Sequence, residues 1–197
     1  MDISGIILVG GKSSRMGTNK ALLDIDGTPM IERVARIMTH VCSEIIIVGG
    51  DKKTYGHMGY KIIPDIYPGC GPLSGIHAGL RATTHYYSFV AACDIPYPNP
   101  QTMELLVNNI GDYDVVMLSL KGYFEPLFSI YSKKFAEVAE NAIKQGKFKI
   151  IDLLPMVNWK SIKLQTSDMI YDHLKNLMNI NTPEDLKLAK NHTRNKS

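Results

Sequence analysis

The chain has 197 residues, 45% of them hydrophobic and 21% charged, and a formal net charge of +3. This is the composition of a globular protein long enough to bury one substantial core, and the charge is too small to indicate nucleic acid binding. No apolar run approaches the ~18 residues of a membrane-spanning helix, and nothing resembles a signal peptide, so we expect a cytoplasmic location and no membrane partner. The three cysteines form no CxxC pair and predict no disulfide framework.

The first element is an apolar strand over residues 6–9, which runs into a glycine turn and then a cluster of cations. Backbone N–H groups at Gly10 and Gly11 can face phosphate oxygens, because no Cβ atoms obstruct them. Arg15 and Lys20 follow the turn, and arginine adds a rigid bidentate donor for an anion. We predict that this loop holds a nucleotide triphosphate; the alternative is a glycine turn with only a structural role.

Two familiar phosphate loops do not fit this segment. The P-loop pattern GxxxxGK[ST] would need glycine at position 6, where the chain has Ile6. The dinucleotide pattern GxGxxG fails because Gly10 and Gly11 are adjacent and Ser14 and Arg15 follow. The sequence therefore indicates a different kind of nucleotide-binding loop.

The following segments alternate between apolar strands and helical periodicity. We expect one helix to start at Thr28-Pro29, with threonine as cap and proline in the first turn, and another at Asn99-Pro100. Strands are expected at 45–48, 61–65, 88–93, 115–118 and 127–131, and further helices at 71–84, at 132–145 and from Thr182. This order predicts a single-domain, three-layer α/β/α sandwich with a mostly parallel, Rossmann-like sheet. We expect the domain to cover residues 1–191, with residues 192–197 as a flexible tail.

In such sheets ligands bind at the carboxyl ends of the strands, and this edge should carry Gly10, Gly49, Asp65 and Asp94. Asp94 ends an apolar strand, so its carboxylate would face the phosphate loop and hold Mg²⁺ together with substrate phosphates. The alternative is that Asp94 only caps the turn before Pro96. Asp65 follows a weaker strand and could be a second metal ligand, a ribose or base contact, or a turn residue.

The sequence offers no obvious general base: it lacks a clear catalytic triad, and its six histidines show no metal-ligand spacing. A phosphate monoester acceptor would not need one, because it is already mostly ionised at pH 7. Such an acceptor could attack the α-phosphorus of a bound nucleotide directly, so that catalysis reduces to alignment and charge neutralisation. A glycine loop, two or three cations and one metal-binding aspartate would be sufficient for this transfer.

Motifs along the chain resemble, in order, those of the molybdenum cofactor guanylyltransferases, which are of the nucleotide-diphospho-sugar transferase type. The first, LVGGKSSRMGTNKALL at residues 8–23, is similar to the family pattern LAGGxSxRMGxDKALL. The others are GTPMIER at 27–33, GPLSGIHAGL at 71–80, CDIPY at 93–97, EPLFSIY at 125–131 and NINTPEDL at 179–186. The resemblance therefore covers essentially the whole chain.

The resemblance implies a role for each matched site residue. It implies that a guanine nucleotide is bound by Leu8, Val9, Gly10, Gly11, Lys20 and Asp65, the first three through their backbone. It implies that Asp94 coordinates Mg²⁺ and that Arg15 lies on the phosphates, with Arg15, Lys20 and Asp94 as the catalytic residues. Residues 71–75, with Asn179 and Asn181, are implied to line the pterin side.

From this resemblance we expect the chain to transfer GMP from GTP to the phosphate of Mo-molybdopterin, giving the guanine dinucleotide form of the cofactor and pyrophosphate. Molybdoenzyme apoproteins or their chaperones are implied as partners. The alternatives are a molybdopterin cytidylyltransferase, a guanylyltransferase with another phosphate acceptor, and a non-catalytic module that delivers the cofactor. Only the enzymes would release pyrophosphate.

Three features depart from the family pattern. Val9 replaces an alanine, which matters little if only its backbone is used. Asn19 replaces the aspartate before the lysine of the first motif and so removes a charge that would orient this lysine. Gly49 and Gly50 stand where the family has an asparagine, so a base or ribose contact there must come from the backbone or is missing. Gly10, where related cytidylyltransferases have alanine, leaves room for a purine.

Overall fold

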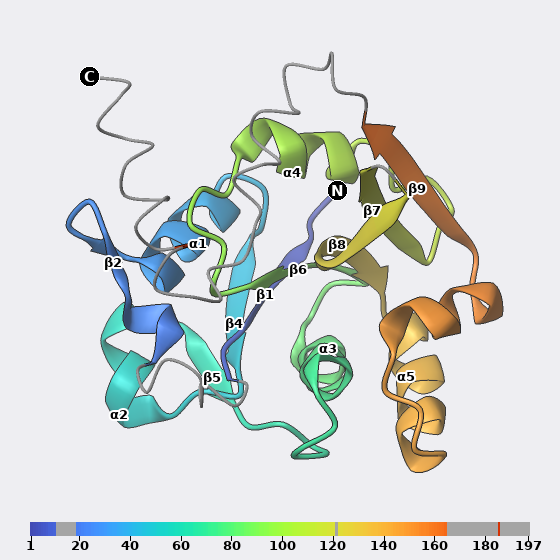
Figure 1. Cartoon of the computed structure of the whole chain (residues 1–197), viewed down its shortest axis with the longest axis horizontal. Helices are drawn as coiled ribbons and strands as arrows, with labels where there is room; N and C mark the ends of the chain where they lie inside the picture. Colours follow the sequence, from blue (N-terminus) through green and yellow to red (C-terminus); the bar gives the residue numbers. More distant parts are fainter. Residues whose placement is uncertain (11–18, 121, 165–184, 186–197) are drawn as a thin grey trace.

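A central seven-stranded sheet with helices on both faces forms the body of the protein (Figure 1). The computed structural model describes residues 1–10, 19–120, 122–164 and 185 of the chain. The strands of the sheet are β1 (Ser4–Leu8), β4 (Glu44–Val48), β5 (Lys61–Ile63), β6 (Tyr87–Ala92), β7 (Val115–Leu120), β8 (Tyr123–Ser132) and β9 (Trp159–Leu164). A separate small hairpin consists of β2 (Asp24–Ile25) and β3 (Thr28–Pro29).

Helices and short turns connect these strands. The α-helices are α1 (Met30–Met38), α2 (Lys52–Tyr55), α3 (Pro72–Ala82), α4 (Pro100–Val107) and α5 (Lys134–Lys144). The 3₁₀ turns are η2 (Lys20–Leu22), η3 (Gly56–Met58) and η4 (Ile150–Met156). Asn99 caps α4 by accepting a hydrogen bond from the Thr102 N–H at 3.1 Å, and Pro100 follows it, as the sequence predicted.

The strand order across the sheet is β5-β4-β1-β6-β8-β7-β9. All neighbouring strands are parallel except at β8, which runs antiparallel to both β6 and β7. The mostly parallel sheet predicted from the apolar runs is therefore confirmed. The reversal at β8 places the beginning of this strand, rather than its end, at the edge where the parallel strands end.

Two hydrophobic cores lie on opposite faces of the sheet. Successive residues of a strand point to opposite faces, so Ile7 packs in the core with α1 and α4, whereas Ile6 packs in the core with α3 and α5. In Figure 1, α1 and α4 lie above the sheet and α3 and α5 below it. Both faces are covered, as a parallel sheet requires, and the three-layer architecture is confirmed.

Two glycines of helix α3 face the side chains of β1. A Cβ atom built on Gly79 would lie 2.7 Å from the side chain of Ile6, and one on Gly75 would lie 2.9 Å from that of Leu8. These residues of α3 are buried, so side-chain atoms of β1 occupy the space that larger residues would need. The glycines therefore determine how closely the helix can pack on the sheet.

The structure corrects two local predictions. Thr28-Pro29 does not start a helix but pairs with Asp24–Ile25 as the second strand of the small hairpin, and α1 begins at Met30 without a side-chain cap bond. Strand β5 ends at Ile63, earlier than predicted, because Pro64 has no N–H to donate to a neighbouring strand. Both differences move element boundaries and leave the topology unchanged.

Other predictions concern cysteines, membranes and the end of the chain. Cys42, Cys70 and Cys93 are all free thiols, in agreement with the absence of a predicted disulfide framework. Among the described residues, no helix has the length and apolar character needed to cross a membrane. The helix predicted from Thr182, the domain limit at residue 191 and the tail at 192–197 lie outside the described residues.

Candidate functional site

The loops that follow β1, β4 and β5 meet at the carboxyl edge of the sheet. A Cβ atom on Gly10 would lie 3.7 Å from the carbonyl oxygen of Gly49, and one on Gly49 would lie 3.8 Å from Asp65 Oδ2. Asp94 stands near the same edge, just after the end of the neighbouring β6. The structure thus brings together the four positions that the strand pattern assigned to this edge.

Gly49 is required by the close approach of the first two loops. Its φ angle is +86°, and a Cβ atom there would lie only 2.2 Å from the backbone oxygen of Val9. Sheet hydrogen bonds continue up to this point, since the Val9 N–H donates to Val48 O at 2.9 Å and the Cys93 N–H donates to Leu8 O at 3.1 Å. These bonds hold the backbone of Leu8 and Val9, two of the predicted nucleotide contacts, in a fixed position.

Lys20 and Asp94 form the charged pair of the site. Lys20 opens η2, Asp94 follows β6, and the lysine Nζ lies 3.9 Å from Asp94 Oδ2. Both side chains are about one-fifth exposed. Burial raises the pKa of Asp94, while the positive charge of Lys20 acts in the opposite direction. The sequence predicted both residues for the site, and the structure places them in contact.

The surroundings of Asp94 fit a divalent cation. Its Oδ1 is buried and has no hydrogen-bond partner, although a carboxylate oxygen in that position is a strong acceptor. No group of three or more acidic, histidine or cysteine side chains that could hold an ion occurs among the residues described. Mg²⁺ is commonly bound by one or two carboxylates plus substrate phosphates, so one aspartate beside a phosphate site suits it.

Asp65 offers a second carboxylate oxygen without a partner. Its Oδ1 is buried and makes no hydrogen bond, and burial raises the pKa of the side chain. A Cβ atom on Gly75 of α3 would lie 3.5 Å from Oδ1 of Asp65. The second carboxylate oxygen, Oδ2, faces Gly49. The carboxylate therefore stands between two residues without side chains. It is placed to accept an N–H or O–H from a ligand.

Glu125 is a third acidic residue of this region, which sequence reasoning did not assign to the site. It lies near the start of the reversed strand β8, and its Oε1 accepts a hydrogen bond from the Leu127 N–H at 3.3 Å. Burial raises the pKa of Glu125, and the negative charge of Asp94 raises it further. The missed signal was the direction of the strand, because the sequence predicted a strand at 127–131 without its direction, and only the antiparallel course of β8 brings Glu125 to this edge.

Several predicted site residues fall outside the described part of the chain. Gly11 and Arg15 of the first loop belong to them, as do Asn179 and Asn181 of the expected pterin side. Gly71, which precedes α3, is described and has a φ angle of +69°, so it turns the chain into the helix. The predictions for the other four residues stay predictions.

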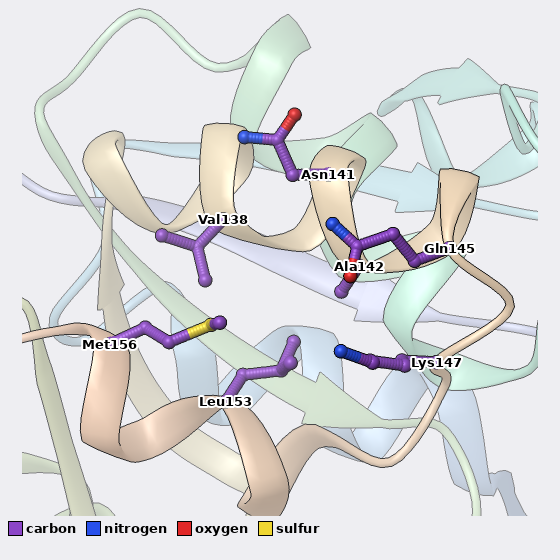
Figure 2. A pocket seen from close by; sticks show the side chains of 7 residues that line it. All are labelled: Val138, Asn141, Ala142, Gln145, Lys147, Leu153 and Met156. Carbon is purple, nitrogen blue, oxygen red and sulfur yellow. The ribbon is translucent and has the colours of Figure 1, made fainter.

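A separate surface hollow of about 250 Å³ lies between α5 and η4 (Figure 2). Its lining consists of Val138, Asn141, Ala142, Gln145, Lys147, Leu153 and Met156. Figure 2 shows Val138, Leu153 and Met156 pointing into the space between the two segments. None of the lining residues belongs to the loops at the strand ends, so this hollow is distinct from the candidate site.

Comparisons with known proteins identify the family of the chain and relatives that cover nearly all of it. The family model described as "MobA-like NTP transferase domain" matches residues 5–157. A protein of Pelotomaculum thermopropionicum named "Probable molybdenum cofactor guanylyltransferase" is 35% identical over 96% of this chain and 93% of its own length. A protein of Desulfosudis oleivorans named "Molybdenum cofactor guanylyltransferase" is 34% identical over 95% of this chain and 94% of its own length.

Solved structures show the same fold. The crystal structure of molybdopterin-guanine dinucleotide biosynthesis protein A from Archaeoglobus fulgidus has a TM-score of 0.82 and 29% identity, and the match covers 98% of this chain and all of that one. The 2-C-methyl-D-erythritol 4-phosphate cytidylyltransferase of Thermus thermophilus has a TM-score of 0.71 at 14% identity, covering 98% of this chain and all of the other. The second likeness concerns the fold alone.

Proposed function

The chain belongs to the family of MobA-like NTP transferases, and from this premise we propose that it transfers GMP from GTP to the phosphate of Mo-molybdopterin. The products are the guanine dinucleotide form of the cofactor and pyrophosphate. The observation that carries this proposal is the pairing of Lys20 with Asp94 at the strand edge, where one oxygen of Asp94 has no hydrogen-bond partner. Relatives that cover nearly the whole chain support the choice of guanine and of the molybdenum cofactor.

Mg²⁺ is the ion that we propose for Asp94. The unpartnered Oδ1 of Asp94 would be its protein ligand, and the remaining ligands would come from the phosphates. Bound there, the ion supplies neutralisation of the phosphate charge that accumulates during nucleotidyl transfer. Lys20 lies beside it and would add a second positive charge on the phosphates, and we propose the same role for Arg15.

The reaction itself needs little covalent chemistry from the protein. An oxygen of the acceptor phosphate forms a bond to the α-phosphorus of GTP, while the bond between the α-phosphorus and the bridging oxygen of pyrophosphate breaks. The electron pair of that bond leaves with pyrophosphate. The acceptor oxygen is already ionised near pH 7, so no side chain has to remove a proton. The residues of the site align the two substrates and compensate their negative charge.

The nucleoside would be held on the β1, β4 and β5 side of the edge. Asp65 has a buried oxygen without a partner and lies between Gly49 and Gly75, so it can accept an N–H or O–H of the nucleoside. No side chain of either glycine stands against the carboxylate, although Oδ1 itself is buried. We also propose that residues 1–191 form one domain and that the enzyme acts in the cytoplasm without a nucleic acid or membrane partner.

The deciding experiment measures pyrophosphate and the dinucleotide product together. The purified chain is incubated with GTP, Mg²⁺ and Mo-molybdopterin, pyrophosphate release is followed by a coupled assay, and the product is identified by mass spectrometry. The proposal requires both products in equal amounts. Faster turnover with CTP would make the chain a cytidylyltransferase. Tight binding of the cofactor without any pyrophosphate would indicate a delivery module.

A further inference from the structure

We propose that Asn19 and Tyr55 are positioning residues, whose hydrogen bond ties the turn that carries Lys20 to the end of α2. This bond, called the tether below, would hold Lys20 ready for the phosphates of the nucleotide. The inference rests on the function proposed above, because it requires Lys20 to bind phosphate. Neither residue needs to contact a substrate itself.

The side chain of Asn19 uses both of its polar atoms. Its Oδ1 accepts a hydrogen bond from the Ala21 N–H at 3.2 Å and thereby caps η2. Its Nδ2 donates to Tyr55 Oη at 2.8 Å. Because the amide group is planar and rigid, the two bonds together fix the orientation of the turn whose first residue is Lys20.

Tyr55 is buried and held in place at its end of the tether. Its side chain is only 3% exposed, and it ends α2, which is itself capped by Asp51 through a 2.8 Å bond from the Thr54 N–H. The ring lies directly against Gly50, where a Cβ atom would come within 2.6 Å of it. Gly50 thus makes room for the ring, and the loop after β4 is packed around it.

The tether connects two segments that are far apart in the sequence. It joins the residue before Lys20 to the last residue of α2, while the Nζ of Lys20 lies 3.9 Å from Asp94 after β6. A lysine has several rotatable bonds, and every degree of freedom already fixed in the free protein is one that binding does not have to restrict. Loss of the tether should therefore weaken nucleotide binding through Lys20.

Three variants separate the tether from the cap and from a general loss of a hydroxyl. Tyr55→Phe removes only the hydroxyl group of a buried ring. Asn19→Ser keeps a good capping residue but lacks the amide N–H. Tyr87→Phe is the matched control, because the hydroxyl of Tyr87 donates to Gly111 O from the start of β6.

The affinity for GTP with Mg²⁺, measured by calorimetry, is the first readout. Tyr55→Phe and Asn19→Ser should bind GTP about three- to tenfold more weakly, as expected for one neutral hydrogen bond, while Tyr87→Phe binds like the wild type. In a Lys20→Ala background, Tyr55→Phe should cause no further loss, because the tether acts through the lysine. Wild-type affinity in Tyr55→Phe, or additive losses in the double variant, would overturn the proposal.

Amide hydrogen exchange of the unliganded protein is the second readout and does not depend on the nucleotide. The N–H of Ala21 should lose protection in Tyr55→Phe and keep it in Tyr87→Phe. Unchanged protection of Ala21 would overturn the tether even if GTP transfer is correct. If the wild type bound no GTP but Ala21 lost protection, the proposed function would fail while the tether itself was supported.

Discussion

Asp94 holds a carboxylate in surroundings that do not favour its negative charge. Burial raises its pKa, the nearby Lys20 compensates only in part, and Oδ1 has no hydrogen-bond partner. Groups of this kind are frequent where a ligand completes the environment of the residue. A single substitution can therefore test its catalytic and its structural effect at once.

We predict that Asp94→Asn reduces turnover at least ~100-fold, because metal-assisted charge neutralisation contributes several kcal/mol to such reactions. Nucleotide affinity should decrease only modestly, and the fold should remain, since asparagine has the same size. The measurement is pyrophosphate release with GTP, Mg²⁺ and Mo-molybdopterin. Turnover close to that of the wild type would show that Asp94 only caps a turn, and Asp65 would be the next candidate for the metal.

The same variant should be more stable than the wild type in the absence of ligands. The folded-state pKa of Asp94 is raised, so the stability associated with this group is complete below its unfolded pKa and is lost as the pH rises through the folded value. At pH 7 the buried, ionised carboxylate therefore lowers the free energy of unfolding of the wild type, whereas asparagine carries no charge. Urea unfolding at pH 7 without nucleotide or metal measures the difference, and a less stable Asp94→Asn would contradict this account.

Lys20→Ala should weaken GTP binding by about 1.5–3 kcal/mol, the usual contribution of a hydrogen bond to a charged group. The free energy of unfolding without nucleotide should also decrease, because Lys20 is only one-fifth exposed and its charge offsets part of the cost of burying Asp94. Lys149→Ala is the control, since Lys149 is also ion-paired but lies at the start of η4, away from the strand edge. Equal GTP affinity in the two variants would show that Lys20 does not contact the nucleotide.

At the scale of secondary-structure elements, the junction between the ends of β1 and β4 can be tested through Gly49. Gly49→Ala should destabilise the fold and abolish nucleotide binding, because its Cβ atom would lie 2.2 Å from the backbone oxygen of Val9. Gly59→Ala provides the reference: its φ angle is also positive, at +75°, but nothing lies within 4 Å of the added atom.

Chemical denaturation of both variants separates backbone strain from collision. Gly59→Ala should cost about 1–2 kcal/mol, the price of a left-handed conformation for a residue with a Cβ atom. Gly49→Ala should cost clearly more, because strain and collision add. Similar losses in the two variants would mean that the loops after β1 and β4 can separate without cost.

The contact between α3 and α5 should weaken in acid. Glu140 of α5 accepts hydrogen bonds from Lys144 and Arg81, each at 2.8 Å, and from Tyr67 at 3.0 Å, which lower the pKa of Glu140 to about 2. A lowered folded-state pKa means that this stability is present above the unfolded value of about 4.5 and is lost as the pH falls toward 2. Glu140→Gln should lose part of the stability at pH 7 and show a flatter decline between pH 4.5 and 2. A decline as steep as that of the wild type would contradict the assignment.

The order of the helices and strands was predictable wherever the hydrophobic periodicity agreed with the residues that typically begin or end an element. The run at 45–48 is apolar throughout, as expected for a strand buried on both faces, and α4 begins with the Asn99-Pro100 signal. Strand β9 was not predicted, because Trp159–Leu164 alternates with lysine and serine and resembles a surface segment. The hairpin at Thr28-Pro29 was mistaken for a helix start because a threonine followed by proline satisfies both patterns.

For the molecule as a whole, the sequence predicted which strand ends form the site, but not what the reversed strand adds to it. Parallel strands bring their carboxyl ends to one edge, so Gly10, Gly49, Asp65 and Asp94 followed from strand order alone. Glu125 could not be found in this way, since its position depends on β8 running against its neighbours. The bond between Asn19 and Tyr55 likewise depends on tertiary packing that no local pattern encodes.

The whole protein should be stabilised by GTP with Mg²⁺ more than by CTP, UTP or ATP. A ligand that binds only the folded state adds about 2.7 kcal/mol at a concentration of 100 times Kd. For a chain of this size that corresponds to a rise in Tm of about 5–10 °C. Thermal unfolding with each nucleotide checks the expectation. Equal shifts for all four would remove the assignment of guanine and leave the fold unaffected.

The close packing of α3 on β1 has a consequence for how this scaffold can change its specificity. Because Gly75 and Gly79 face the side chains of Leu8 and Ile6, neither position can take a larger residue without displacing β1 side chains. A larger residue at Gly75 would collide with Leu8 and would also approach Asp65 Oδ1. Evolution or design that reshapes the surroundings of Asp65 should therefore meet less resistance at other positions than on this face of α3.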